Sequence, residues 1–402
     1  MLVVKKFGGS SVADKERIFN VARRCIEDYE KGNDVVVVLS AMGKTTDGLI
    51  AKAHEINPNP PKRELDMLLV TGEQVSVALM AMAMSSLGVP AVSLNAAQVV
   101  MHTSSAYGSA KLKRIDVERI RHELESRRIV IVTGFQGINK YDDFTTLGRG
   151  GSDTTAVALA AALHADVCEI YTDVEGVYTA DPRVVPNARK LAEVSYDEML
   201  EFASLGAKVL HNRSVEMAKK YGVKLVVLSS LTRAEGTIVK EETKVERTLI
   251  SGVAADASVA RISVLGVENK PGITFRVFNL LAKNHINVDI IIQSVTEPGK
   301  KDISFTVAKT DLSDTMDLLR ENRESLTARE IVSEEGVAKL SVIGAGMCSN
   351  PGVAAKMFEA LYSADVNTEM IATSEIRITA LIDERDVKRA MRAVHDAFDL
   401  TD

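Results

Sequence analysis

The sequence predicts an α/β protein with a mostly parallel sheet, followed by two smaller β-α-β-β-α-β units. Short β-branched runs alternate with helical patterns over residues 1–245, which is typical of a parallel sheet covered by helices. A charged stretch from Ser229 to Arg247 then interrupts the apolar pattern, and an internal repeat occupies the last third. We therefore predict one domain over 1–245, a linker with a first small domain over 246–335, and a second small domain over 336–402.

Local patterns predict the elements of the first domain. Strands that are buried on both faces are expected at 35–39, 129–132, 167–171 and 223–228. Helices are expected at 64–87, at 154–164, and where six residues share one helical stripe: Ile18, Val21, Ala22, Cys25, Ile26 and Tyr29. Ligands bind such sheets beyond the carboxyl ends of the strands, so we expect a site in the loops that follow them.

Two similar copies make up the last third of the chain. Their Pro-Gly turns align Gly272 with Gly352, an offset of 80 residues, and the same offset pairs Asn287 with Asn367. Each copy reads as a strand, the Pro-Gly turn, a helix, a strand around the asparagine and a further strand. Chance similarity between two amphipathic stretches is the alternative, but the constant spacing disfavours it. Two units of this kind commonly pair side by side, with small-ligand sites at their junction.

Composition excludes several classes of protein. Among 402 residues, 49 Lys+Arg against 55 Asp+Glu give a net charge of −6, which disfavours nucleic acid and anionic membranes as partners. No apolar stretch is expected to reach the ~18 residues that span a bilayer, and the N-terminus lacks the apolar region of a signal peptide. Cys25, Cys168 and Cys348 form no Cys-x-x-Cys, so we expect neither a disulfide framework nor a cysteine zinc site. These features indicate a protein of the reducing cytoplasm.

Two glycine-rich loops are the strongest candidates for anion binding. In the first, a strand runs into Gly8 and Gly9 and then a helix, with a lysine alongside; backbone N–H groups and the helix N-terminus there suit a phosphate. A turn of this kind also occurs without a ligand. The second, LGRGGSDTT at 147–155, adds Arg149, whose planar fork binds a carboxylate or phosphate in two places. Asp153 either caps the following helix or pairs with a lysine of the first loop.

A third candidate loop directly follows a predicted strand. Residues 172–178 and 180–183 mix acidic, aromatic and basic side chains, which suits a nucleotide but also occurs in surface turns. Two common nucleotide motifs are absent: a Walker A loop would need glycine where Val38 stands, and a dinucleotide fingerprint would need glycine at Asp153. No Gly-x-Ser-x-Gly elbow indicates a hydrolase.

Together these segments carry a family resemblance. The chain resembles bacterial aspartokinases in KKFGGSSV at its start, SAMGKTTD at 40–47, LLVTGEQVS at 68–76, TTLGRGGSDTTA at 145–156 and YTDVEGVYTADPR at 171–183. The C-terminal repeats resemble the paired regulatory ACT domains of that family, and the likeness covers the whole chain. Acetylglutamate kinase, UMP kinase and glutamate kinase share the expected amino-acid-kinase fold but lack this tandem of repeats, which makes them poorer matches.

The resemblance implies phosphorylation of the side-chain carboxylate of L-aspartate by ATP with Mg²⁺, the first step of lysine, threonine and methionine biosynthesis and of diaminopimelate synthesis. The chemistry agrees with the residues. A carboxylate nucleophile is already ionised at pH 7 and needs no general base. Catalysis then consists of holding two anions together and neutralising charge on the transferred phosphoryl group, for which Lys, Arg, loop amides and a metal are suited.

The resemblance also implies site residues. Lys6, Asp153 and Arg149 would be catalytic: Lys6 bridges the phosphates, Asp153 orients Lys6 and Arg149 binds the aspartate α-carboxylate. The implied nucleotide positions are Lys6, Phe7, Gly8, Gly9, Thr172, Asp173, Tyr178, Asp181, Arg183 and Lys208. The implied substrate positions are Ser40, Thr46, Glu73, Arg149, Gly150, Gly151 and Ser152, with Glu73 facing the substrate ammonium. No metal ligand of the chain itself is expected. The alternative interpretation of Glu73 and Lys208 is that each is an ordinary solvated side chain on a helix.

The ACT-like repeats imply feedback by lysine, threonine or both, in a homo-oligomer formed through these repeats. The implied effector positions are Asn269, Pro271, Gly272, Ile273, Asp289, Gln293, Asn350, Gly352, Val353, Asn367, Thr368, Ser374 and Glu375. Asp289 aligns with Glu369, and either is equally explained as an ordinary acid at a strand end. Two other functions remain open: a sibling kinase acting on a different acid, and an amino-acid sensor whose kinase half is inactive.

Overall fold

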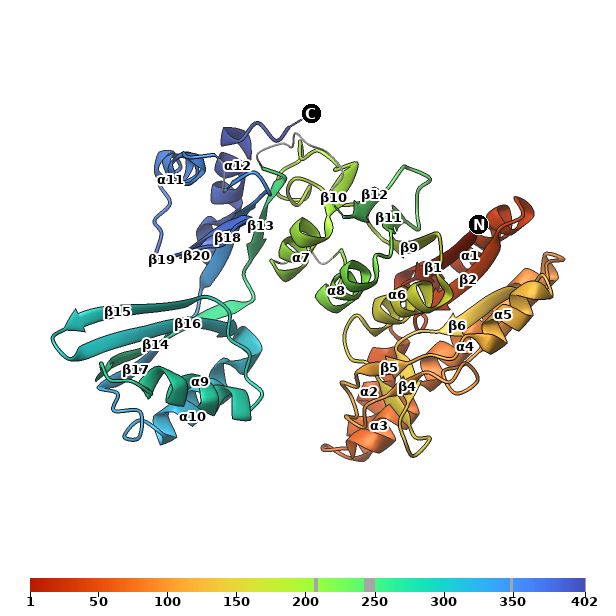
Figure 1. Cartoon of the computed structure of the whole chain (residues 1–402), viewed down its shortest axis with the longest axis horizontal. Coiled ribbons are helices and arrows are strands. Elements are labelled where there is room, and N and C mark those ends of the chain that lie inside the picture. Colours follow the sequence, from red (N-terminus) through yellow and green to blue (C-terminus); the bar gives the residue numbers. More distant parts are fainter. Residues whose placement is uncertain (206–208, 242–249, 348–349, 402) are drawn as a thin grey trace. The chain divides into compact units, whose positions relative to one another are not determined.

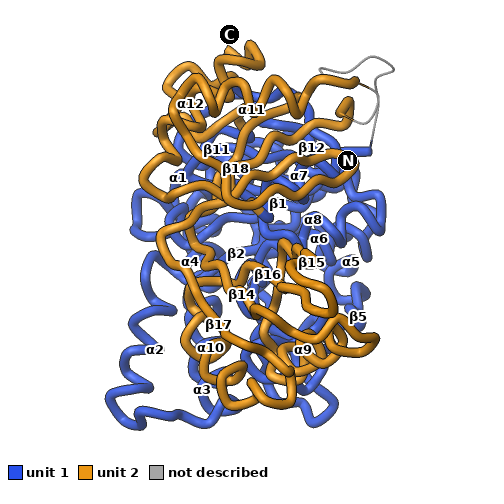
Figure 2. Tube along the Cα trace, turned by 90° about the vertical axis from the view of Figure 1, so that its left-hand side faces the viewer, with its two compact units in different colours: residues 1–177, 190–204, 208–245 blue, residues 178–189, 205–207, 246–402 orange. Residues whose placement is uncertain are grey.

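The computed structural model describes residues 1–205, 209–241, 250–347 and 350–401. The chain divides into two compact units (Figure 2). Unit 1 comprises residues 1–177, 190–204 and 208–245, and unit 2 comprises residues 178–189, 205–207 and 246–402. The division into consecutive stretches that we predicted differs from this at residues 178–189, which lie inside the first stretch but pack in unit 2.

Unit 1 is built on an eight-stranded sheet with the order β10-β12-β11-β9-β1-β2-β6-β3 (Figure 1). Its strands are β1 (Leu2–Phe7), β2 (Asp34–Leu39), β3 (Ala91–Leu94), β6 (Ile129–Thr133), β9 (Val167–Thr172), β10 (Glu193–Ser195), β11 (Leu225–Ser229) and β12 (Thr237–Lys240). All pairings are parallel except that of β12 with β11. The mostly parallel α/β class predicted for this part is confirmed. β12 lies inside the stretch predicted as a boundary. It is a four-residue strand between β10 and β11 in which only Thr237 and Val239 are buried, so it shows no apolar run.

Helices cover this sheet, and a small second sheet, β5-β4-β7-β8, lies beside it. The helices are α1 (Lys15–Glu30), α2 (Thr45–Ile56), α3 (Lys62–Leu69), α4 (Thr71–Ser86), α5 (Glu118–Glu125), α6 (Gly151–Leu163), α7 (Tyr196–Ser204) and α8 (Asn212–Tyr221), with the 3-10 turn η1 (Gly9–Val12). The small strands are β4 (His102–Thr103), β5 (Leu112–Arg114), β7 (Gln136–Ile138) and β8 (Phe144–Thr146). The predicted apolar stripe of α1 packs on the sheet, with Val21, Ala22 and Cys25 fully buried.

The stretch expected to form one helix over 64–87 is two helices, α3 and α4, that meet at Val70. Residues 62–86 are long and apolar enough to cross a membrane by length and composition alone, which corrects the expectation that no stretch approaches that length. Half of the most apolar window is buried inside the protein, and Val77, Met80 and Met84 pack in the core of the sheet. A core helix of a globular protein passes the same test, so this feature is weak evidence for a membrane span.

Unit 2 contains two four-stranded antiparallel sheets, with the orders β15-β16-β14-β17 and β13-β18-β20-β19. The first includes β14 (Val259–Glu268), α9 (Ile273–Lys283), β15 (Ile291–Glu297), β16 (Lys300–Ala308), α10 (Leu312–Glu321) and β17 (Glu330–Glu334). The second includes β13 (Gly252–Asp256), β18 (Val337–Ile343), α11 (Val353–Ser363), β19 (Met370–Thr373), β20 (Arg377–Asp383) and α12 (Val387–Ala397). The short 3-10 turns η2 (Lys309–Asp311) and η4 (Glu384–Asp386) follow β16 and β20.

The predicted β-α-β-β-α-β order is confirmed for the first copy. The structure differs from the prediction in two details. β13 pairs with β18, so residues 252–256 complete the sheet of the second copy although they precede the first. The strands expected around Asn287 and Asn367 begin later, at Ile291 and Met370, which leaves both asparagines in the preceding loops.

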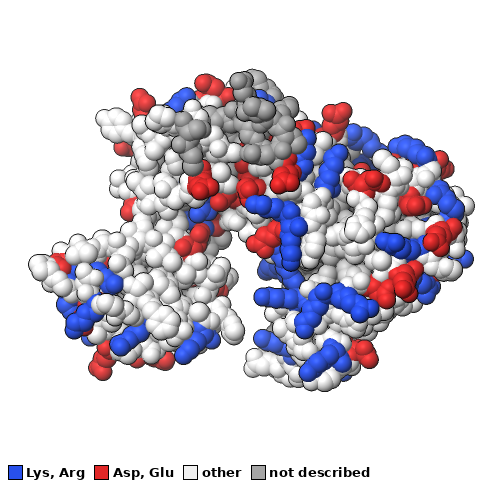
Figure 3. Space-filling view, in the orientation of Figure 1, with Lys and Arg blue, Asp and Glu red and all other residues white. Residues whose placement is uncertain are grey.

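Acidic and basic side chains are interspersed on the face of the molecule in Figure 3, as expected for 49 cationic and 55 anionic residues.

Residues 178–189 belong to the core of unit 2. The apolar side chains of Ala180 and Val185 are buried against Leu340 and Val342 of β18. Thr179 is also held there, since its Oγ1 lies 2.9 Å from Nε2 of the buried His395.

Candidate active site

Five parallel strands of unit 1 end at one edge of the sheet. The registers pair Phe7 with both Leu39 and Tyr171, and continue through β6 and β11. The loops that follow β1, β2, β6, β9 and β11 therefore emerge together. This is the edge at which parallel sheets bind ligands.

At this edge the two glycine-rich loops are joined by an ion pair. The Lys6 Nζ lies 2.7 Å from the Asp153 Oδ1, and each side chain is only 12% exposed. Lys6 is the second-last residue of β1. Asp153 is in the first turn of α6, where a carboxylate also interacts favourably with the helix dipole. Of the two roles left open for Asp153, the structure contains the ion pair; no side-chain hydrogen bond caps α6.

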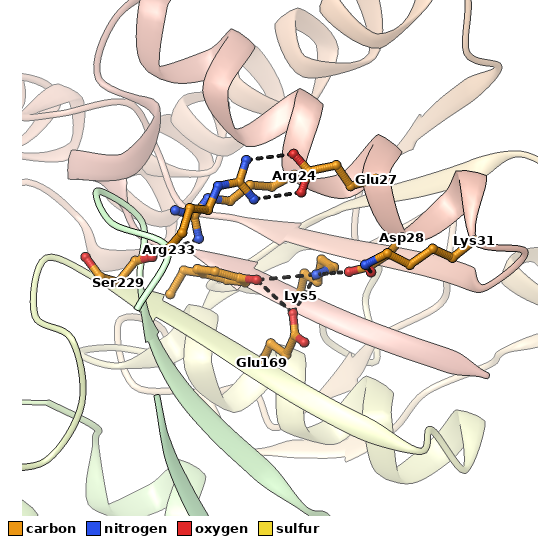
Figure 4. Close-up of polar contacts among 9 residues, drawn as sticks. Lys5, Arg24, Glu27, Asp28, Lys31, Glu169, Ser229 and Arg233 are labelled. Carbon is orange, nitrogen blue, oxygen red and sulfur yellow. Dashed lines mark hydrogen bonds and ion pairs between the residues drawn. The ribbon is translucent and has the colours of Figure 1, made fainter. Parts of the chain in front are cut away.

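The adjacent Lys5 points to the opposite face of the sheet, because side chains alternate along a strand. Its Nζ lies 2.6 Å from Asp28 and 2.5 Å from Glu169, and 3.3 Å from the Tyr171 hydroxyl (Figure 4). Burial alone would lower the pKa of Lys5, but Glu169, Tyr171 and Asp28 raise it overall, so Lys5 stays charged. A cation so neutralised is a structural group rather than a partner for a phosphate.

The same network reaches the loop after β11. The guanidinium of the buried Arg24 stacks over the Tyr171 ring and donates to the carbonyls of Ser229, at 2.9 Å, and Thr232. Beside it, Arg233 and Glu27 form a two-fold ion pair with both distances 2.7 Å (Figure 4). These contacts fix the carboxyl ends of β9 and β11 relative to α1.

The second glycine loop has a backbone that only glycine adopts easily. Gly150, the N-cap of α6, has φ +69°, and a Cβ there would overlap the His211 ring. The start of the loop is anchored because Asp66 accepts hydrogen bonds from the Thr146 N–H and hydroxyl, and because Arg213 donates to the Leu147 carbonyl at 3.0 Å. A pocket beside the loop is lined by Gly150, Asp153, Ala203, Ser204, Val209, Leu210, His211 and Asn212.

Between these anchors the Arg149 side chain is exposed, and it has no hydrogen bond or ion pair with any residue that the structure describes. Every N–H of its guanidinium is therefore open to a ligand. On the opposite side of the loop, the Ser40 hydroxyl donates to the Ser152 hydroxyl at 2.9 Å, which links the end of β2 to the start of α6. Thr46 lies in the first turn of α2.

Glu73 is a buried acid with one unused oxygen. It lies in the first turn of α4 and is 2% exposed. Its Oε1 accepts a hydrogen bond from the Ala41 N–H at 3.1 Å, whereas its Oε2 has no partner among the described residues. Burial raises the pKa of Glu73 to about 7. A buried, unpaired carboxylate oxygen is costly, so this group is suited to receive a cation from a ligand.

Sequence reasoning missed one position at this edge, Gly134. It directly follows β6, and a Cβ there would lie 2.6 Å from the Ser152 Oγ. Any larger residue would displace Ser152 and with it the start of α6. A glycine directly after a predicted buried strand was a usable sequence signal for this position, but Gly134 belongs to none of the motifs considered.

The implied nucleotide positions divide between the units. Six positions lie in unit 1, at the carboxyl ends of β1 and β9: Lys6, Phe7, Gly8, Gly9, Thr172 and Asp173. The remaining described positions are in unit 2: Tyr178, Asp181 and Arg183. There Arg183 binds the Asp181 carboxylate at 2.7 Å and holds the pKa of that carboxyl below its usual range. Lys208 lies outside the described residues.

The implied effector positions surround the starts of α9 and α11. Gly272 and Gly352 are the N-caps, with φ of +93° and +103°, so both turns need glycine. The side chains of Ile273 and Val353 are buried in the cores of their repeats. Both residues begin a helix, where backbone N–H groups have no intrahelical partner and are available to a ligand. Gln293 accepts a hydrogen bond from Thr274 at 2.9 Å. The other positions lie in the turns before the helices and in or beside β15 and β19: Asn269, Pro271, Asp289, Asn350, Asn367, Thr368, Ser374 and Glu375.

Comparisons with known proteins agree with this architecture. Residues 1–229 match the model of the amino acid kinase family, and residues 260–324 and 340–398 each match an ACT domain. The aspartokinase of Bacillus sp. strain MGA3 is 52% identical over 401 residues, covering 100% of this chain and 98% of that protein. The aspartokinase of Geobacillus stearothermophilus is 50% identical with the same coverage.

Solved structures give the same result. E. coli aspartokinase III in complex with aspartate and ADP superposes with a TM-score of 0.85 at 28% identity, covering 99% of both chains. Its complex with lysine and aspartate gives a TM-score of 0.78 at 29% identity, again covering 99% of both chains. The fold and the edge site define an amino acid kinase with paired ACT domains, and the chain belongs to the aspartokinase family within that class.

Proposed function

We infer that this chain transfers the γ-phosphoryl group of ATP to the side-chain carboxylate of L-aspartate, giving 4-phospho-L-aspartate and ADP. The observation that carries the inference is the Lys6–Asp153 pair, which places a buried ammonium between the two glycine loops. An aspartokinase related at 28% identity binds aspartate and ADP. The product is the acyl phosphate that opens lysine, threonine and methionine synthesis, and the expected location is the cytoplasm.

The reaction requires positioning and charge neutralisation rather than proton transfer. The aspartate carboxylate is ionised at pH 7, and one of its oxygens attacks the γ-phosphorus as the bond to the ADP oxygen breaks. Lys6 neutralises charge that develops on the phosphoryl oxygens, while Asp153 holds its ammonium in place. The backbone N–H groups of Gly8 and Gly9 donate to the phosphates.

The substrate is held at both of its other charges. Arg149 binds the α-carboxylate of aspartate, because its exposed guanidinium has every donor available. Glu73 receives the α-ammonium on its unpaired Oε2. Ser40, Thr46, Ser152 and the N–H groups of Gly150 and Gly151 supply further hydrogen bonds.

Mg²⁺ would be supplied together with the nucleotide. The described residues contain no group of three or more His, Cys, Asp or Glu side chains that could hold a metal ion by themselves. Mg²⁺ in kinases is characteristically bound by substrate phosphates with few protein ligands, and we propose the same mode for this chain. When bound, the ion neutralises charge on the β- and γ-phosphate oxygens.

An assay of ADP release with L-aspartate as acceptor tests the function. We expect ADP release that depends on aspartate and the formation of an acyl phosphate that hydroxylamine traps as a hydroxamate. Release with glutamate, N-acetylglutamate or UMP but not aspartate would instead identify a sibling kinase. No release with any acceptor would identify a sensor.

Arg149→Lys should raise the KM for aspartate by about tenfold or more and leave the KM for ATP nearly unchanged. A lysine keeps the charge but cannot form the two parallel hydrogen bonds of a guanidinium. Steady-state kinetics with each substrate varied in turn measures this effect. Arg121→Lys, an exposed arginine on α5, is the matched control. An increase confined to the KM for ATP would move Arg149 to the nucleotide.

The ACT repeats bind lysine, threonine or both and inhibit the kinase. This proposal is supported by the two ACT matches and by the relative that was solved in complex with lysine. An effector inhibits only through its different affinity for the active and inactive states, typically ~1–3 kcal/mol of coupling. Assembly through these repeats into a homo-oligomer completes the proposed arrangement.

Asn367→Ala should weaken inhibition by lysine or threonine and leave the KM for aspartate without effector unchanged. Asn367 is exposed in the loop before β19, in unit 2, so its loss removes an effector contact without disturbing a core. Inhibition curves and calorimetric titration of each amino acid, alone and together, measure the effect. Asn59→Ala, in an exposed turn, is the control. If neither amino acid produced heat with the wild-type chain, the repeats would have no effector role.

A further inference from the structure

The two repeats of unit 2, residues 259–334 and 337–397, can be compared position by position. Hydroxyl pairs mark equivalent points of the two sheets: Ser263 lies 2.8 Å from Ser304, and Ser341 lies 2.7 Å from Thr379. β14 therefore aligns with β18 at an offset of 78 residues, and β16 with β20 at an offset of 75. The segment from the Pro-Gly turn to the next strand keeps the offset of 80.

The repeats contact each other through equivalent apolar residues. One buried cluster contains Val259 and Ile290 of the first repeat together with Val337 and Met370 of the second. Val259 is equivalent to Val337, and Ile290 is equivalent to Met370. Each repeat therefore presents the same surface to the other, as in an isologous contact between two subunits.

A buried lysine of the second repeat crosses this contact. Lys339 is 4% exposed, and its Nζ lies 3.5 Å from Asp256 in its own sheet and 2.6 Å from Asp289 of the first repeat. Asp256 is its direct neighbour across the strand pair of β13 and β18. Lys339 thus joins an acid of its own sheet to an acid of the other repeat.

The equivalent residue of the first repeat, Arg261, makes the equivalent contacts. It binds Glu334, its neighbour across β14 and β17, and its Nη1 lies 3.0 Å from Glu369 of the second repeat. Glu369 is the counterpart of Asp289. Each repeat therefore gives one cation and receives one, so the two bridges are reciprocal.

A third ion pair joins two positions that are equivalent to each other. Lys309 follows β16 and Glu384 follows β20, and their charged atoms lie 2.7 Å apart. Their backbones are held alike, since the Lys309 N–H donates to the Ser258 carbonyl and the Glu384 N–H donates to the Gly336 carbonyl. If two first repeats paired in this way, lysine would face lysine, and two second repeats would bring glutamate against glutamate.

We propose that this contact is an interaction surface specific for unlike repeats: Arg261 and Lys339 hold the repeats together, and the Lys309–Glu384 pair makes the choice of partner. The bridges of Arg261 and Lys339 alone cannot distinguish like from unlike repeats. On a second copy of the first repeat, Arg261 would also meet an acid, Asp289. Only the pair between equivalent positions changes from attraction to repulsion when like repeats meet. The first repeat therefore takes as its partner the second repeat.

A charge-reversal cycle in the full-length chain tests the pair by thermal unfolding of unit 2. Lys309→Glu and Glu384→Lys should each lower the midpoint by about 1–4 °C, because each places like charges together. The double variant should recover most of the loss. All differences should shrink in 1 M salt, where the Debye length is ~3 Å. Lys388→Glu, an exposed lysine on α12, controls for net charge.

A double variant that loses as much as the two single variants together would overturn the proposal, since the two side chains would then not interact. Cross-linking tests the choice of partner directly. Treated with a short bismaleimide, Lys309→Cys/Glu384→Cys should give a bridge within one chain, whereas neither single variant should give linked dimers through its new cysteine. A dimer linked through position 309 in both chains would show pairing of like repeats and would refute the selectivity. Neither readout depends on kinase activity.

Discussion

Lys6→Ala is expected to lower kcat by about two to four orders of magnitude while ATP and aspartate still bind. The ammonium of Lys6 lies at the meeting point of the two glycine loops, 2.7 Å from Asp153, and its charge acts on the phosphoryl group mainly in the transition state. Steady-state kinetics gives kcat, and isothermal calorimetry with ATP and with aspartate measures binding.

A control separates this effect from a general loss of charge or folding. Lys113→Ala removes an exposed lysine of β5 and should leave kcat unchanged. Thermal unfolding of Lys6→Ala is needed as well, because the variant leaves the Asp153 carboxylate buried without its cation. If the folded variant turned over within a few fold of the wild type, Lys6 would not be the catalytic cation.

Glu73→Gln is expected to lower kcat/KM for aspartate by about 30-fold or more at pH 8 and to remove its pH dependence between pH 6 and 8. Burial raises the pKa of Glu73 to about 7, so the carboxyl is mainly neutral at pH 6 and mainly ionised at pH 8. Only the ionised form attracts the ammonium of aspartate. In the wild type, kcat/KM should therefore follow the ionised fraction of Glu73, which rises about fivefold from pH 6 to 7 and about twofold more by pH 8. The loss in the variant follows because the ammonium of aspartate is left without its anionic partner.

The pH profile of the variant gives this prediction its sharpest test. Glutamine keeps the shape of the side chain and its acceptor for the Ala41 N–H, so the core around α4 should remain intact. Glu55→Gln, an exposed acid on α2, is the matched control and should keep the wild-type profile. A Glu73→Gln enzyme that still rose with pH to the same plateau would assign the titration to another group.

Much of the fold was predictable because its signals are local. The β-branched runs of β2 and β6 are buried on both faces as predicted, and the stripe of α1 lies within one helix. The same burial predicted for β9 and β11 is wrong, since both strands contain half-buried residues. The repeat was recognisable in the sequence because Gly272 and Gly352 both have a left-handed backbone, which glycine adopts more readily than other residues. In the second glycine loop of the site, Gly148 and Gly150 have the same left-handed backbone, whereas Gly8 of the first loop has φ −74°.

Other features depended on residues far apart in the sequence. Lys5 and Lys6 are identical neighbours, and only the pairing of β1 between β2 and β9 decides which one faces Asp153 and which is neutralised by Asp28 and Glu169. The unpaired oxygen of Glu73 exists because α4 packs its first turn beneath Ala41.

The sequence by itself determined the class of fold, the loops that carry the chemistry and the presence of two regulatory copies. The tertiary structure decided which charges are paired, which are left open for a ligand, and that residues 178–189 pack in unit 2. It also decided that Arg261 and Lys339 each bridge to the other repeat. The physical reason is the sequence separation of the interacting residues. Backbone conformation and hydrophobic periodicity depend on residues near in the sequence. The burial of a charge and the identity of its partner depend on the distant segments that the packed core brings beside it.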